Sequence, residues 1–185
     1  MRVLGVDPGS NATGYGLIER KGGQVCHLRS GVLRPPSGAP LSERLRFLYE
    51  ELHVIAQESE AEVAVVERVF IASNPQSALV LGQARGAILA SLGASGLHVS
   101  ELAAREVKKA ITGSGAADKA QMQMMVTRLL KLEKKPASDA ADALAMALTY
   151  AQSGVLAELP VRSGRRRSSR NSRRAMTEFV LGKMR

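Results

Sequence analysis

The 185-residue sequence has very little cysteine and histidine, and this scarcity excludes several kinds of site. Its one cysteine, Cys26, cannot form a disulfide within the chain. Its three histidines, His27, His53 and His98, lie far apart and do not have the spacing of zinc ligands. A metal ion bound by this chain would therefore be held by oxygen atoms.

The sequence also lacks a long hydrophobic run. No stretch approaches the roughly eighteen consecutive apolar residues that a membrane-spanning helix requires. The first seven residues have the pattern of a strand rather than of a signal peptide. We therefore expect a soluble, cytoplasmic protein. With 45% hydrophobic residues the chain can bury a core of its own, and one folded domain is the default expectation for this length.

Positive charge is concentrated at the C-terminal end. The net charge is +9, but residues 161–185 hold nine of the 26 lysines and arginines and one of the 17 acids, which leaves the rest of the chain nearly neutral. Residues 162–174 contain seven arginines and no apolar residue. This composition predicts a folded domain over residues 1–155 and a basic, disordered tail over residues 156–185. The tail is either a solubilising terminus or, as the arginine run favours, an arm that contacts phosphates.

The order of hydrophobic patterns predicts an α/β fold. Short apolar runs separated by turn residues come first, and runs with helical spacing dominate the second half. The expected strands are residues 2–7, 13–20, 24–33, 62–67 and 96–100. The expected helices are residues 41–58, 77–92, 101–111, 119–132 and 136–148. This order fits a mixed five-stranded sheet that begins with an antiparallel meander and is covered by helices on both faces.

Four carboxylates stand out by their positions. Asp7 and Glu67 each close an apolar run of strand character, whereas Asp139 and Asp142 lie three residues apart in an alanine-rich helix. That spacing places the last two on one helix face, and the alanines let another backbone come close. The first strand and the strand after the first helix are commonly neighbours in a mixed sheet, so all four acids can meet. Such a cluster needs cations, which predicts Mg²⁺ and chemistry at phosphate.

Each acid also has a purely structural interpretation. Asp7 precedes a Pro-Gly pair and could simply start a turn. Glu67 stands beside Arg68 and could belong to a cross-strand ion pair. Asp139 and Asp142 follow a helix start, where acids complement the helix dipole. The conjunction of the four acids, rather than any one of them, favours the metal site.

Four segments resemble, in order, the successive motifs of the RuvC family of Holliday junction resolvases. They are residues 7–16 (DPGSNATGYG), 67–70 (ERVF), 77–86 (SALVLGQARG) and 139–145 (DAADALA). The resemblance runs from residue 2 to about residue 150. It implies a ribonuclease H-like fold, a homodimer, and symmetric nicking of four-way DNA junctions during homologous recombination and DNA repair. Hydrolysis would leave a 5′ phosphate.

The resemblance also implies the site. Asp7, Glu67, Asp139 and Asp142 would be the catalytic metal ligands, holding two Mg²⁺ ions for which Mn²⁺ could substitute. The implied partners are four-way junction DNA, a second copy of the chain, and the RuvA and RuvB branch-migration proteins.

Positive charge near the acids is expected to bind the substrate. Lys108 and Lys119 could be solvated helix residues, but both match basic positions that bind DNA near the active site in the family. Arg105 and Lys109 are left open. Phe70 would ordinarily be a core residue, yet its match to the family motif favours stacking on an unstacked base at the junction centre.

The predicted helix over residues 77–92 carries small residues on one side, with Gly82 and Gly86 four apart. Small residues allow close helix approach, and we expect them to pack within the fold, with contact between subunits as the alternative. A dimer is expected in either case, because a four-way junction has two-fold symmetry and needs paired nicks.

Three other functions fit parts of the pattern. An actin-like or sugar-kinase-like phosphotransferase also has an Asp-x-Gly turn after its first strand, but it needs a duplicated domain, and this chain shows no internal repeat. A noncatalytic DNA-binding protein could use the basic tail, although carboxylates that face phosphate would hinder binding. A ribonuclease H-like nuclease with another substrate would share the acids, and only the fuller motif match separates it from a junction resolvase.

Overall fold

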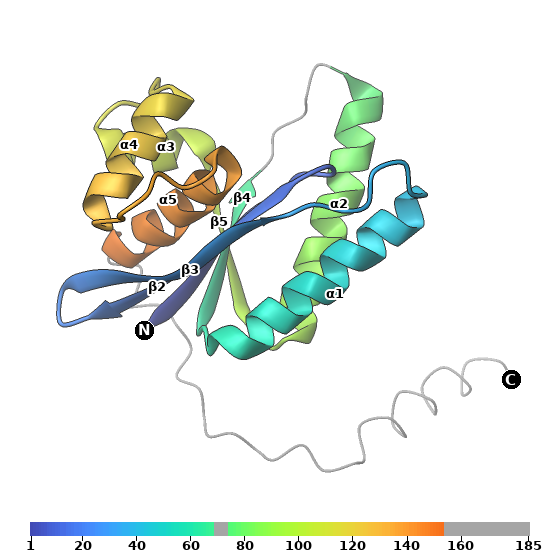
Figure 1. Cartoon of the computed structure of the whole chain (residues 1–185), viewed down its shortest axis with the longest axis horizontal. Helices are drawn as coiled ribbons and strands as arrows, with labels where there is room; N and C mark the ends of the chain where they lie inside the picture. Colours follow the sequence, from blue (N-terminus) through green and yellow to red (C-terminus); the bar gives the residue numbers. More distant parts are fainter. Residues whose placement is uncertain (69–73, 154–185) are drawn as a thin grey trace, which may run out of the picture.

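The computed structural model describes residues 1–68 and 74–153, which form a sheet between two layers of helices. The strands are β1 (Arg2–Asp7), β2 (Thr13–Lys21), β3 (Gln24–Leu33), β4 (Val63–Arg68) and β5 (His98–Ala103). The helices are α1 (Leu41–Ser59), α2 (Pro75–Ala94), α3 (Ala104–Thr112), α4 (Lys119–Leu129) and α5 (Ser138–Gln152). Within these residues, the predicted mixed five-stranded sheet with helices on both faces is confirmed (Figure 1).

The sheet has the strand order β3-β2-β1-β4-β5. The first three strands form the predicted antiparallel meander, with a two-glycine turn between β2 and β3. Strand β4 returns after α1 to pair parallel with β1, and β5 returns after α2 to pair parallel with β4. The expectation that the first strand and the strand after the first helix are neighbours is therefore confirmed.

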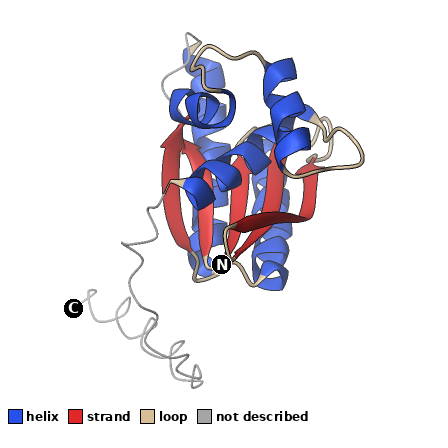
Figure 2. Cartoon of the chain, turned by 90° about the vertical axis from the view of Figure 1, so that its left-hand side faces the viewer, coloured by secondary structure: helices blue, strands red, loops and turns tan. Residues whose placement is uncertain are grey.

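Alternation along the central strands divides the core into two parts. On one side, Leu4 and Val6 of β1 and Val66 of β4 pack against α1 and α2. On the other side, Val3 and Val65 pack against α3, α4 and α5. Figure 2 shows the strands standing between these helices. The apolar runs are thus nearly continuous because both faces of the central strands are buried.

Helix α5 lies directly on the backbones of β1 and β2. A methyl group added at Gly5 would meet the carbonyl of Ala143, and one added at Gly14 would meet the carbonyl of Asp139. At Gly16 it would meet Leu144. The three glycines and the alanines of α5 therefore allow the helix and the sheet to come closer than larger side chains would permit. They determine the distance between α5 and the sheet.

Several predicted boundaries are wrong, among them the end of the last helix, which continues to Gln152 instead of ending at residue 148. Residues 101–103 were expected to be helical, but they extend β5, because their parallel pairing with β4 continues to Arg68 and Ala103. The same strand was expected to begin at Gly96, but that residue has a φ of +75° and lies in the turn before β5, which begins at His98. Helix α4 ends at Leu129 rather than at residue 132, and Lys131 takes a left-handed backbone conformation with a φ of 51°.

The expectation that Gly82 and Gly86 pack within the fold is also wrong. Both are exposed, and no heavy atom of a neighbouring element lies within 4 Å of a methyl group built on either one. Helix α2 buries the opposite side, including Ala84 and Ile88, against α1 and the sheet. Its length and apolar composition would suit a membrane span, but α1 and β5 cover one side of it.

Substitution of Gly14 by alanine tests the contact between α5 and the sheet. The new methyl group would meet backbone atoms, which cannot move aside as a flexible side chain can. We expect Gly14→Ala to lower the free energy of unfolding by about 1–3 kcal/mol, the usual cost of overpacking. Urea unfolding monitored by circular dichroism measures this change.

The matched control is Gly93→Ala in α2, where a methyl group meets nothing within 4 Å. Alanine is the better helix former by up to about 1 kcal/mol, so this variant should be as stable as the wild type or more so. Equal stability of Gly14→Ala and Gly93→Ala would contradict the proposed packing.

Candidate metal centre

Strands β1 and β4 bring Asp7 and Glu67 together. Their parallel register pairs Val6 with Val66, so the next residue of each strand lies beside the other at the same edge of the sheet. Alternation turns both side chains toward the face covered by α5. The structure thus places the two strand-ending acids as neighbours, as predicted.

Helix α5 brings the other two acids over this edge. Asp7 pairs with Gly14 across the β1–β2 ladder, and the missing side chain at Gly14 is where the backbone of Asp139 passes. Asp142 follows three residues later on the same face of α5. The glycine contact therefore decides where the first turn of the helix, with its acids, lies relative to Asp7.

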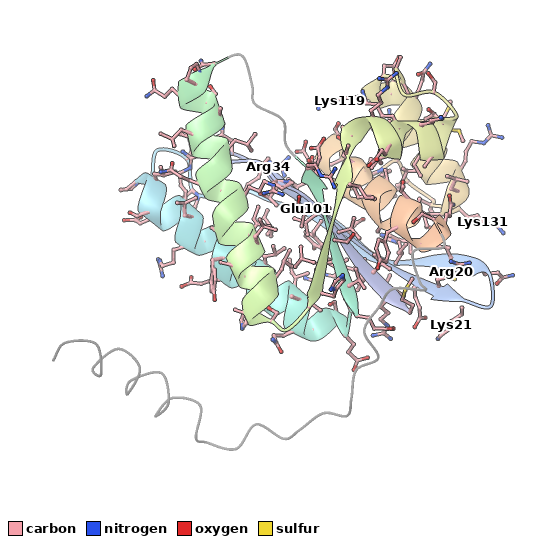
Figure 3. The ribbon with its side chains drawn as sticks, turned by 180° about the vertical axis from the view of Figure 1, so that it is seen from behind. Arg20, Lys21, Arg34, Glu101, Lys119 and Lys131 are labelled. Atoms are coloured by element: carbon pink, nitrogen blue, oxygen red, sulfur yellow. The ribbon has the colours of Figure 1, made fainter. Side chains whose placement is uncertain are left out.

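These elements enclose a cleft of about 280 Å³. Asp7, Glu67 and Asp142 line it, together with Lys108 of α3 and Lys119 of α4. Asp139 lies outside the lining but close enough for its charge to act on Asp7. Figure 3 labels Lys119 at the start of α4. The structure therefore gathers the four predicted acids and both predicted lysines at one place.

An apolar wall of the cleft was not predicted. Val107 of α3, Met122 of α4 and Met146 of α5 line it beside the charged groups. Their helical spacing marks them only as core residues, and sequence patterns carry no signal that they would border the acids. This wall excludes water from part of the cleft and so strengthens the electrostatic interactions inside it.

The position of Asp7 is unfavourable for a negative charge. Burial, followed by the charges of Glu67, Asp142 and Asp139, raises the pKa of the Asp7 carboxyl from 3.8 to about 8. A hydrogen bond with Glu67 adds to the increase. In the absence of a cation, this pKa favours the protonated form of Asp7 at neutral pH, in which the carboxyl acts as the donor toward the Glu67 carboxylate.

The two lysines offset part of this repulsion. Burial raises the pKa of Glu67 and that of Asp142, while the positive charges of Lys108 and Lys119 act in the opposite direction on both carboxyl groups. The hydrogen bond from Asp7 also lowers the pKa of Glu67. The net direction for both acids is still upward, so two ammonium groups do not neutralise the cluster.

The carboxylates of the cleft are suitable ligands for Mg²⁺, although the described side chains are not arranged as a complete coordination shell. In residues 1–68 and 74–153, no three acidic, histidine or cysteine side chains already stand where they could hold one ion together. The negative charges around Asp7, which raise the pKa of its carboxyl, nevertheless favour a cation at this place. Carboxylate oxygens are the ligands that Mg²⁺ prefers. Ser138 directly precedes Asp139 in the sequence, and its Oγ is the one buried side-chain polar atom of the described residues without a hydrogen-bond partner.

A larger hollow, of about 880 Å³, lies elsewhere. It runs between β3 and residues 129–136, where Glu133 is its only acid and His27 faces Ser30 at 2.9 Å. It contains none of the four predicted acids, so its size does not make it the metal centre.

Phe70, the predicted base-stacking residue, lies outside the residues that the structure describes.

Comparison with known proteins gives one consistent result. The sequence pattern of the family "Crossover junction endodeoxyribonuclease RuvC" matches residues 3–150. The protein of that description from Burkholderia vietnamiensis is 48% identical over 154 residues, which cover 83% of this chain and 85% of the relative. The protein of that description from Cupriavidus taiwanensis is 46% identical over 154 residues, which again cover 83% of this chain and 85% of the relative.

Solved structures agree. Thermus thermophilus RuvC matches with a TM-score of 0.73 and 32% identity, covering 82% of this chain and 93% of the other. T. thermophilus RuvC in complex with a Holliday junction substrate matches with a TM-score of 0.78 and 31% identity, covering 85% and 96%. The yeast mitochondrial resolvase Ydc2, at 14% identity and a TM-score of 0.59, shares the fold.

The charge state of Asp7 leads to a prediction about stability. Its pKa is about 8 in the folded protein and 3.8 ordinarily, so between these pH values the folded chain holds a proton that the unfolded chain has released. The metal-free protein should therefore lose stability as the pH rises from about 4 to 8. Asp7→Asn removes this loss. We expect its Tm in EDTA at pH 8 to exceed that of the wild type by several degrees, since 1 kcal/mol corresponds to about 2–4 °C at this size.

Thermal unfolding between pH 5 and pH 8.5 measures the effect. Glu50→Gln, which changes an exposed acid of α1, is the matched control and should follow the wild type at every pH. A Tm for Asp7→Asn at or below that of the wild type throughout this range would show that the acids do not repel one another.

Proposed function

Because the chain belongs to the RuvC family of crossover junction endodeoxyribonucleases, it is a Holliday junction resolvase of DNA recombination and repair, and we propose that it cuts by paired, Mg²⁺-dependent nicks at the carboxylate cluster. The observation that carries the proposal is the meeting of Asp7, Glu67 and Asp142 in one cleft, with Asp139 beside them. The T. thermophilus relative solved with a Holliday junction supports the same substrate for this chain.

Asp7, Glu67, Asp139 and Asp142 would hold two Mg²⁺ ions, and Mn²⁺ could replace them. When bound, such ions make a water molecule more acidic and stabilise the leaving 3′ oxygen, so that hydrolysis leaves a 5′ phosphate. The environment of the cluster favours a proton on Asp7 in the absence of metal. With cations bound, Asp7 would release that proton to water, and all four carboxylates could act as oxygen donors.

Lys108 and Lys119 would contact the phosphates that flank the cut. Both line the cleft of the acids, and each comes from a different helix. Lys119 opens α4, where the side chain of Asp118 accepts a hydrogen bond from the backbone of Gln121 and so holds the first turn in place. For Phe70, outside the described residues, we propose stacking on an unstacked base, on the resemblance alone.

A second copy of the chain would cover the exposed face of α2. This face is formed by Leu79, Gly82, Gln83, Gly86 and Ala90, which recur at helical spacing, are exposed and carry no charge. Leu79 alone is 64% exposed. The glycines would let two such helices approach closely, and a two-fold axis between them would present two active sites to a two-fold symmetric junction.

The remaining proposals rest on the family. RuvA and RuvB would be the partners that move the junction, and the protein would act in the cytoplasm. Residues 1–155 would form the nuclease domain, and residues 156–185 would serve as an arginine-rich arm that binds phosphates without sequence preference.

Cleavage of a synthetic four-way DNA junction tests the proposed function. With Mg²⁺ we expect symmetric nicks in opposing strands of the junction, and none in a linear duplex of the same sequence. Asp7→Asn should abolish cleavage, because the site loses a donor oxygen and a negative charge. Its affinity for the junction in EDTA at neutral pH should be unchanged, because the carboxyl of Asp7 favours its uncharged form there and asparagine is uncharged too.

The other outcomes are informative in the same assay. Cutting of an RNA–DNA hybrid in place of the junction would assign the chain to another class of ribonuclease H-like nuclease. Junction binding without any cutting would favour a noncatalytic role. Full activity of Asp7→Asn at ordinary Mg²⁺ would contradict the metal centre itself.

A charge on the exposed face of α2 tests the proposed dimer. We expect Leu79→Glu to weaken dimerisation by at least about tenfold, because two like charges would face each other across the axis. Sedimentation equilibrium measures the dissociation constant, and a cruciform plasmid shows whether the two nicks remain paired. The matched control is Val54→Glu on α1, where an apolar residue is 52% exposed on another helix. Equal dimerisation of the two variants would exclude this face as the interface.

A further inference from the structure

The segment SALVLGQARG, residues 77–86, contributes no residue to the cleft described above, yet it contains Arg85, the only charged residue of α2. The Arg85 side chain is only 20% exposed. It extends from the inner side of α2 toward the ends of β4 and β5. An arginine buried to this degree needs partners for its donors, and these partners lie directly behind the metal centre.

Arg85 binds two groups at once. Its Nε donates to the backbone carbonyl of Glu67 at 3.2 Å, and its Nη2 lies 2.6 Å from Oε1 of Glu101. Figure 3 shows Glu101 on β5, between α2 and the helices of the other layer. The planar guanidinium therefore joins a helix to the two strands that end beside the cleft.

Glu101 is itself held from two sides. It pairs in register with Val66, the residue before Glu67, across the β4–β5 ladder. Arg68 also approaches it, with its Nε 3.9 Å from Oε2 of Glu101 and its Nη2 3.5 Å from the Glu101 carbonyl. Glu101 thus fixes the orientation of Arg85, in the way that outer partners orient the ligands of a metal ion.

Arg85 binds the carbonyl of Glu67, a residue whose backbone pairs with a neighbouring strand on one side only. The pairing of β4 with β1 stops at Val66, so Glu67 has lost the ladder on that side and keeps only β5. Its carboxyl must nevertheless stay in the same cleft as that of Asp142, whose charge repels it. A backbone free to turn would let the carboxylate swing away from the other acids.

We propose that Arg85 is a positioning residue that holds the backbone of Glu67 so that its carboxylate is ready to bind metal. This inference rests on the proposed role of Glu67 as a ligand. Lysine keeps the charge of arginine but cannot reproduce its two-pronged geometry, so Arg85→Lys separates positioning from charge.

The experiment measures the metal affinity of the free protein. Titration calorimetry with Mn²⁺ on the full chain should show about tenfold weaker binding for Arg85→Lys, within the range known for outer-shell partners of metal ligands. Junction cleavage should need correspondingly more Mg²⁺ and recover at saturating Mg²⁺. The affinity for the junction in EDTA should stay the same. Glu101→Gln, which keeps an acceptor for Arg85 but loses the charge, should have a smaller effect in the same direction.

Arg46→Lys is the matched control, since Arg46 also pairs with a glutamate, Glu50, but lies exposed on α1. It should leave every value unchanged. A lower Tm for Arg85→Lys with unchanged Mn²⁺ affinity would reduce Arg85 to an ordinary structural ion pair and overturn the proposal. Weaker junction binding in EDTA with unchanged Mn²⁺ affinity would make it a phosphate contact and overturn it equally. Failure of the wild type to bind Mn²⁺ would instead refute the proposed metal centre.

Discussion

The contact between helix α5 and three glycines of β1 and β2 is the constraint on which the site depends. It brings the backbone of Asp139 against Gly14, the partner of Asp7 in the sheet, and it leaves no room for larger side chains. The buried alanines of α5 stabilise this approach through close packing. The same approach forces carboxyl groups together and raises the pKa of Asp7. Packing energy in the core therefore offsets electrostatic repulsion at its edge, which is the usual relation between a stable fold and a reactive site.

Repulsion in the cleft also determines how it can meet its substrate. A phosphodiester is an anion, and a cluster of carboxylates alone would reject it. The charges of Lys108 and Lys119 offset only part of the rise in the pKa of Glu67 and of Asp142, so the cleft still favours added cations. Burial and the neighbouring acids favour a proton on Asp7 in the metal-free cleft. In the proposed metal centre, cations would take the place of that proton and make the cleft attractive to the phosphates of DNA.

The strand-ending acids could be predicted because their signals are local. Asp7 and Glu67 each follow an apolar run, and the spacing of Asp139 and Asp142 places both on one helix face. The glycines of the β1–β2 pair could not be predicted as a docking surface, since that requires knowing which element lies above them. Neither could the end of β5, where pairing with β4 overrides a helical pattern over residues 101–103. The bond from Arg85 to Glu67 joins residues that are 18 positions apart, through a backbone carbonyl that no sequence pattern marks.

Helix α2 carries an exposed outer face and, on its inner face, the arginine that binds Glu67. Its outer face is uncharged and exposed, and its inner face carries Arg85 to the carbonyl of Glu67. A junction must be cut twice at symmetric positions, so each active site should be competent only when its partner is in place. In the proposed dimer, α2 would contact the second subunit through its outer face, while Arg85 on its inner face holds the backbone carbonyl of Glu67. A displacement of α2 would then move Arg85, and with it Glu67, whose backbone the β1–β4 ladder no longer supports.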